Sequence, residues 1–119
     1  MRKSDFRDLQ IWHKSKALCP VLYKLTKSFP DEEKFGVVSQ IRRAALSVSL
    51  NIAEGHGRSS NADFVRFLYM SLGSIRELEA LLEISVELDF ISNCSEYIGR
   101  LQELAKMITS LINRLKADS

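Results

Sequence analysis

The sequence contains few of the residues that mark several common protein classes. Its two cysteines, Cys19 and Cys94, are far apart and belong to no CxxC motif, which argues against a disulfide scaffold or a zinc site. The two histidines, His13 and His56, also stand alone, and lone histidines are seldom metal ligands. Two prolines and five glycines leave no room for a long flexible linker. We therefore expect reduced thiols, no metal and no cofactor.

Long hydrophobic runs are absent too. The longest uncharged run, 44–53, is far shorter than the roughly 20 residues that a membrane span requires. The N-terminal residues MRKSDFRDLQIW carry charge without a following apolar core, so we expect no signal peptide, no membrane contact and a cytoplasmic location. At 119 residues, with 45% hydrophobic and 27% charged residues, the chain has the composition of one globular domain spanning 1–119.

The apolar residues that are present repeat with a helical period throughout the chain. We expect a first helix that Pro20 kinks and Pro30 closes, a second that begins between Asp31 and Gly36 and stops near Gly55, and a third that is capped by Ser60. A fourth follows 92–93. The predicted core positions are Ile11, Ser15, Leu18, Leu22, Leu25 and Phe29; Val37, Ile41, Ala44, Val48 and Ile52; Phe64, Leu68, Leu72, Ile75, Leu78, Leu82 and Val86; and Tyr97, Leu101, Leu104, Ile108, Leu111 and Leu115.

Short connections between four such helices predict an all-α, up-down-up-down antiparallel four-helix bundle. The second helix has more apolar surface than such a bundle needs. Beside its core face lies a polar stripe made of Arg43, Ser47, Asn51, Glu54 and Arg58. A second apolar stripe follows, made of Leu46, Leu50 and Ala53. In the third helix, Tyr69, Met70, Leu81, Ile84 and Leu88 also lie off the core face.

Helices that are apolar on more than one side are usually buried on more than one side. We therefore predict a homo-oligomer whose interface uses Leu46, Leu50, Asn51, Ala53 and Glu54. The alternative is a broad monomeric core with a few exposed apolar side chains.

Three stretches carry a family resemblance: DLQIWHKSKALCPVLYKLT, FPDEEKFGVVSQIRRAALSVSLNIAEGHGRSS and FVRFLYMSLGSIRELEALL. Together they resemble the four-helix-bundle family of the 23S rRNA intervening-sequence protein, whose pattern includes QIRRAA and NIAEG. Ser49 departs from that pattern, because the family usually has proline there. The resemblance implies a bundle that assembles into a ring, commonly a pentamer, without known catalysis. The family is similar to the accessory protein of diversity-generating retroelements, a basic pentameric barrel that binds reverse transcriptase and nucleic acid.

The net charge of +2 hides a gradient along the chain, which by itself does not choose between two interpretations. Residues 1–30 carry seven Lys or Arg and two acids, whereas 61–90 carry two Arg and six acids. The basic and acidic helices could pair with each other, or the basic side could meet an anion. The candidate phosphate ligands are Lys3, Arg7, Lys14, Arg43 and Arg58. Alternatively, Arg43 and Arg58 pair with Glu54 or with an acid of a neighbouring subunit, and the basic helix is a solvated face.

No set of residues resembles a reaction centre. Asn51 and Glu54 have no second acid, base or nucleophile beside them, and hydrogen bonding between subunits suits them better than catalysis. We therefore predict a non-enzymatic oligomeric accessory scaffold that binds RNA, DNA or a ribonucleoprotein through a basic surface repeated by ring symmetry. The alternative is an oligomeric adaptor that binds only proteins, such as a reverse transcriptase.

Overall fold

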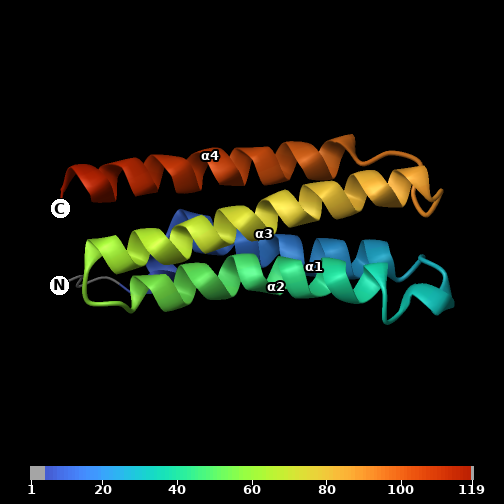
Figure 1. Cartoon of the computed structure of the whole chain (residues 1–119), viewed down its shortest axis with the longest axis horizontal. Coiled ribbons are helices and arrows are strands. Elements are labelled where there is room, and N and C mark those ends of the chain that lie inside the picture. The colour runs from blue at the N-terminus through green and yellow to red at the C-terminus, as the bar shows by residue number, and fades with distance from the viewer. Residues whose placement is uncertain (1–4, 119) are drawn as a thin grey trace.

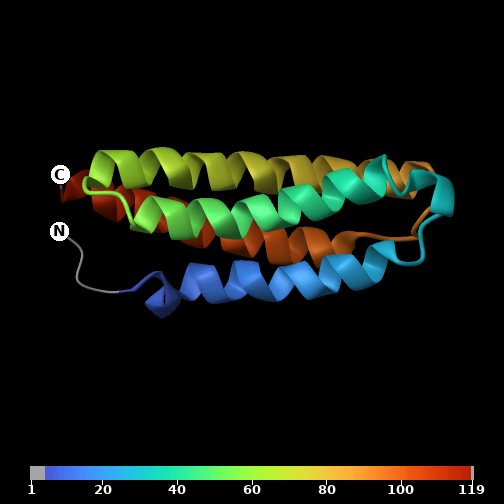
Figure 2. The same cartoon turned by 90° about the horizontal axis from the view of Figure 1, so that it is seen from below.

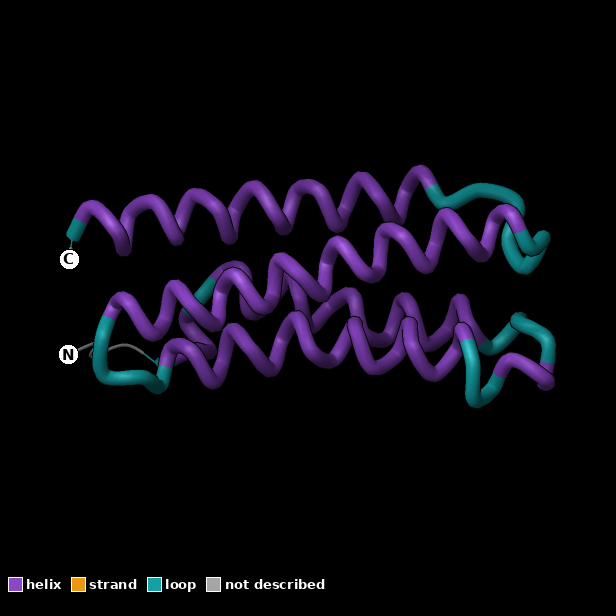
Figure 3. The backbone as a smooth tube through the Cα atoms, in the orientation of Figure 1, coloured by secondary structure: helices purple, strands orange, loops and turns teal. Residues whose placement is uncertain are grey.

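The computed structural model describes residues 5–118, which form a rod of four long helices measuring 47 × 21 × 19 Å (Figure 1). The helices are α1 (Gln10–Thr26), α2 (Val37–His56), α3 (Asn61–Glu87) and α4 (Ser95–Ala117), and two short 3-10 helices, η1 (Phe6–Asp8) and η2 (Asp31–Glu33), precede α1 and α2. Within residues 5–118 there is no β-strand, as Figure 3 shows. The predicted all-α architecture is confirmed.

Successive helices run antiparallel and pack side by side, which gives the expected up-down-up-down bundle (Figure 2). The α2–α3 pair makes the most extensive contact, α1 packs on α2, and α4 packs on α3. By contrast, α1 and α4 approach each other at few points, and α1 and α3 lie diagonally across the bundle, with their Cα atoms more than 8 Å apart. None of the helices within 5–118 has the length and apolar character that crossing a bilayer requires.

The periodicity located most of the core correctly. Residues such as Leu22, Ile41, Leu68 and Leu101 are wholly buried. Several positions differ from expectation. Leu81 is buried rather than off the core, and Ile112, which the heptad pattern passed over, is buried in α4. The predicted core residues that are only half-buried are Leu25, Val37, Leu72, Val86, Tyr97, Leu111 and Leu115. Leu81 is covered because α3 packs against two neighbours, α2 and α4, so that its buried face is wider than one stripe.

The helix ends also differ from expectation in informative ways. The acidic run before α2 forms η2, a separate short helix, and α2 begins only at Val37, after the non-helical backbone of Gly36. The Glu33 carboxylate accepts a hydrogen bond from the Val37 N–H at 3.4 Å, so it still faces the positive end of α2. Ser60 caps α3 as predicted, accepting from the Asp63 N–H at 3.1 Å.

The C-terminus of α3 closes with a Schellman motif that has an acid in place of the usual glycine. The Phe90 N–H donates to the Ser85 carbonyl at 2.9 Å and the Asp89 N–H donates to the Val86 carbonyl at 3.0 Å. Asp89 has a φ of 63°, a left-handed conformation that Asp tolerates better than most residues. Phe90 then packs its ring on Phe29, with ring centroids 5.4 Å apart, and so joins the loops at this end of the bundle.

Candidate oligomer and nucleic-acid interfaces

The predicted second apolar stripe of α2 lies on the surface. Leu46 is 41% exposed and Leu50 is 59% exposed, one helical turn apart, and Ala53 beside them is half-buried. On α3 the large exposed apolar side chains are Tyr69, Met70 and Ile84, and Leu88 follows directly after its last residue. Leu46 and Leu50 therefore present apolar surface that the rest of the chain does not cover.

Ser47 of the polar stripe is hydrogen-bonded both within α2 and to α3. Asn51 donates from its side-chain amide to the carbonyl of Ser47 at 2.9 Å and to its hydroxyl at 3.0 Å. The Ser47 hydroxyl also meets the Ser74 hydroxyl at 2.9 Å, and Ser71 donates to the Val48 carbonyl at 2.8 Å. The donor side of the Asn51 amide is thus used within the chain, which leaves its carbonyl oxygen as the group that could reach a neighbouring subunit.

Arg58 lies beyond the end of α2, because the helix stops at His56. Its guanidinium approaches Glu54 at 3.7 Å and Asp63 at 3.8 Å, and lies 4.7 Å from the centre of the Phe67 ring. The structure therefore favours the interpretation in which Arg58 and Glu54 pair within one chain.

Arg43 lies at the N-terminal end of the polar stripe. It is exposed at the rim of a hollow of about 430 Å³ between α2 and α3, which is also lined by Gln40, Ser47 and Glu77. Within residues 5–118 no ion pair engages Arg43. Its guanidinium is available to an external anion.

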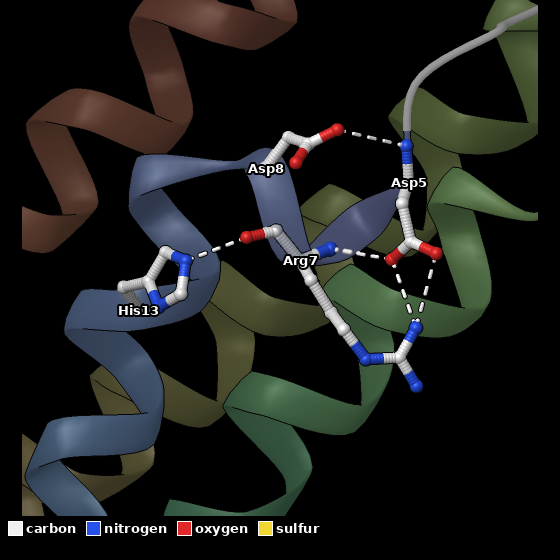
Figure 4. Close-up of polar contacts among 4 residues, drawn as sticks. All are labelled: Asp5, Arg7, Asp8 and His13. Carbon is white, nitrogen blue, oxygen red and sulfur yellow. Dashed lines mark hydrogen bonds and ion pairs between the residues drawn. The ribbon is translucent and has the colours of Figure 1, made fainter.

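The candidate phosphate ligands Arg7 and Lys14 lie on two different helices, so they do not form one helical face. Lys3 lies outside the described residues, and Arg7 belongs to η1, because α1 starts only at Gln10. The Arg7 guanidinium turns back onto both oxygens of Asp5 at 3.0 Å, and His13 contacts the Arg7 carbonyl (Figure 4). The pKa of Asp5 is lowered, mainly because its carboxylate accepts a hydrogen bond from the Arg7 backbone N–H.

Lys14 lies on α1 proper and bridges to α4. Its ammonium lies 3.0 Å from the carboxylate of Glu103, and both side chains are substantially exposed. Exposed ion pairs of this kind typically contribute about 0–1 kcal/mol, so a phosphate can compete for the lysine.

The fold separates the basic helix from the acidic helix. Helix α1 carries three lysines and no acid, whereas α3 carries five acids and two arginines. The Cα atoms of α1 and α3 lie more than 8 Å apart, and no ion pair among the described residues joins the two helices, so their charges do not neutralise each other directly. Of the two sequence-based alternatives, pairing between these helices within one chain is wrong.

Sequence reasoning missed the structural role of Arg42. This half-buried residue donates to the Thr26 hydroxyl at 2.9 Å and to the Tyr23 carbonyl at 3.2 Å, and its guanidinium lies 4.6 Å from the centre of the Tyr23 ring. It therefore ties α2 to the last turn of α1. The QIRRAA motif gave only the adjacency of two arginines, and the partners lie on a different helix.

Replacing Arg42 with Lys should destabilise the fold by about 1–2 kcal/mol, because one ammonium cannot reproduce the planar fork and ring stacking. Chemical denaturation monitored by circular dichroism measures the change. Arg43→Lys is the matched control, since Arg43 is exposed and its replacement should change stability by less than about 0.5 kcal/mol. Equal effects of the two substitutions would contradict the role given to Arg42.

The cysteines and histidines form no common centre. Cys19 is half-buried and Cys94 is buried, and both are free thiols. Burial, with a further contribution from Glu83, raises the pKa of the Cys94 thiol and disfavours its reactive thiolate. Within residues 5–118 there is no cluster of three His, Cys, Asp or Glu side chains that could hold a metal ion.

Comparisons with known proteins agree with this architecture. The model of the 23S rRNA-intervening sequence protein family matches residues 7–110. A crystal structure of a protein with unknown function from the S23 ribosomal protein family, from Bacteroides thetaiotaomicron, is similar with a TM-score of 0.76 and 25% sequence identity over 86% of this chain and 97% of that one. Among curated proteins none matches. Since the family model covers most of the bundle, the chain belongs to the 23S rRNA-intervening sequence protein family.

Proposed function

We propose that this protein is a non-enzymatic subunit of a homo-oligomeric ring, a pentamer as the family resemblance implies, that serves as an accessory scaffold for RNA, DNA or a ribonucleoprotein. The observation that carries the assembly is the exposure of Leu46 and Leu50 in the single chain. Covering two leucines one turn apart on a long helix removes apolar surface from water, which favours association. Ala53 and the carbonyl of Asn51 border the same contact.

The separation of charge supports a polyanionic ligand. Helix α1 presents lysines away from the acids of α3, and Arg43 is exposed without an ion pair to another described residue. The pairs Arg7–Asp5, Lys14–Glu103 and Arg58–Glu54 are exposed and weak enough for phosphates to replace the carboxylates, although Arg58 also approaches the half-buried Asp63. Ring symmetry repeats each such patch, so a chain with a net charge of only +2 gains avidity for a polyanion.

A labelled structured RNA tests the binding part of this proposal. Contacts to several phosphates should lower the affinity by orders of magnitude between about 50 and about 200 mM salt. Lys14→Glu and Arg43→Glu should each weaken binding several-fold at the lower salt concentration, as measured by fluorescence anisotropy. No single RNA base is expected to dominate, because phosphates carry no sequence information.

The matched control is Arg76→Glu, the same change of charge on the acidic helix α3. It should weaken RNA binding much less than Lys14→Glu, with circular dichroism confirming that both variants remain helical. An absence of binding at low salt, or an equal loss in Arg76→Glu, would leave the protein-binding adaptor as the better description.

A further inference from the structure

The side of the bundle where α1 faces α4 is incompletely closed. Contacts between these two helices are sparse, and two hollows of about 240 Å³ and about 250 Å³ lie between them, lined by residues from both. The first hollow lies beside Leu18 and Leu104, and the second lies beside Ile11, Met107 and Leu111. Because α1 and α4 are antiparallel, the hollows follow one another along the seam, which we call the α1–α4 groove.

The floor of the α1–α4 groove is apolar. Leu18, Leu104 and Ile11 are buried beneath it, and Met107 and Leu111 are half-buried along it. The positions 104, 107 and 111 recur every three or four residues, so they form a continuous stripe on α4. A ligand that contacts the protein only through phosphate groups would make no contact with this apolar stripe.

The rim of the groove is positively charged. Lys14, Arg100 and Arg114 line it, against a single acid, Glu103, which is paired with Lys14. Arg100 and Arg114 are exposed, and neither forms an ion pair with another residue of the described part of the chain. The two arginines therefore offer guanidinium groups above an apolar floor.

We propose that the α1–α4 groove binds an acidic amphipathic helix of a partner protein. A helix laid along such a groove places apolar side chains at i, i+3, i+4 and i+7 into the hollows. Its flanking carboxylates meet Arg100 and Arg114, whose planar forks suit carboxylates. The apolar floor favours a protein segment over a nucleic acid as the occupant.

This site is compatible with the oligomer but does not depend on it. Leu46 and Leu50 lie on α2, which has no contact with α4, so a ring built on these leucines need not cover the groove. Each subunit would then display one groove, and a multivalent partner would gain avidity.

The experiment uses intact purified protein and a labelled synthetic peptide, RELEALLEISVELD. This sequence, that of residues 76–89, combines five acids and one arginine with helically spaced apolar residues, so it represents the proposed ligand class. We expect saturable binding with a Kd on the order of 10 µM by fluorescence anisotropy. A scrambled peptide of the same composition should bind at least about tenfold more weakly, because it lacks the apolar stripe.

Two substitutions locate the site. Met107→Gln keeps the length and the net charge but removes apolar surface from the floor, and Arg114→Gln removes a rim cation. Each should weaken peptide binding about tenfold, whereas Lys106→Gln, which removes an exposed α4 cation that does not line the hollows, should change it less than about twofold.

RNA binding by the same variants separates this inference from the proposed function. Met107→Gln should leave RNA affinity unchanged, because it alters no charge. No peptide binding, equal binding of the scrambled peptide, or unchanged peptide binding by both Met107→Gln and Arg114→Gln would overturn the inference even if RNA still binds. A loss of RNA binding but not of peptide binding in Met107→Gln would instead assign the groove to nucleic acid and would overturn it too.

Discussion

Leu50→Asp should reduce the proposed ring to single chains of 13.6 kDa while the helix content stays the same. Leu50 is 59% exposed within one subunit, so a polar replacement has little effect on the folding of that subunit and should change its stability by less than about 0.5 kcal/mol. In an oligomer the same position is covered, and a buried carboxylate without a partner costs several kcal/mol. The cost recurs at every interface of a symmetric ring. Light scattering after gel filtration measures the mass, and circular dichroism measures the helicity.

Thr109→Asp is the matched control for this substitution. It introduces the same carboxylate at an exposed helical position, but on α4 rather than on the apolar stripe of α2, and should leave the mass unchanged. Leu46→Asp, one turn before Leu50, should repeat the effect of Leu50→Asp. A wild-type protein that already elutes as a single chain, or a ring that survives both α2 substitutions, would refute the proposed assembly.

The parts of the fold that follow from local periodicity were predictable from the sequence. Val48 and Leu78 each belong to a series of apolar residues that recurs about every 3.6 residues. This spacing alone places them on the buried face of their helix. Ser60 was predictable for the same reason, since a cap depends on residues only a few positions away.

Contacts between residues on different helices depend on how closely those helices approach one another, and the periodic pattern of one helix does not contain that information. The pair Lys14–Glu103 joins residues 89 positions apart, and Arg42 finds its partners on the preceding helix. The predicted phosphate ligands could be named from residue type alone. Which of them already have carboxylate partners was decided by the tertiary structure, and Arg43 is the one for which no ion pair is found among the described residues.

Gly55 shows most clearly the difference between what local sequence predicts and what the packing of helices decides. The sequence predicted that α2 stops near Gly55, and the helix does end one residue later, at His56. Gly55 itself is the last-but-one residue of the helix rather than the residue after it, and no glycine within 5–118 has a positive φ. A Cβ at position 55 would lie 2.6 Å from the Cβ of Phe67 and 3.0 Å from the ring of Phe64. Gly55 therefore permits the close approach of α2 and α3, the pair with the most extensive contact in the bundle.

Gly55→Leu should accordingly destabilise the protein by about 3 kcal/mol or prevent folding, because a side chain has to push α3 away from α2. Gly55→Ala should cost less, since its single methyl displaces the helices less and alanine favours helix by about 1 kcal/mol over glycine. Gly99→Ala provides the control: the residue lies inside α4, and a methyl group added there would meet no other atom within 4 Å, so the substitution should stabilise the protein by about 0.5–1 kcal/mol. Urea denaturation of the three variants measures their free energies of unfolding and so gives the order of their stabilities. If Gly55→Ala stabilised the protein as much as Gly99→Ala does, helix propensity alone would explain both positions, and the close α2–α3 contact would not be the reason for glycine at position 55.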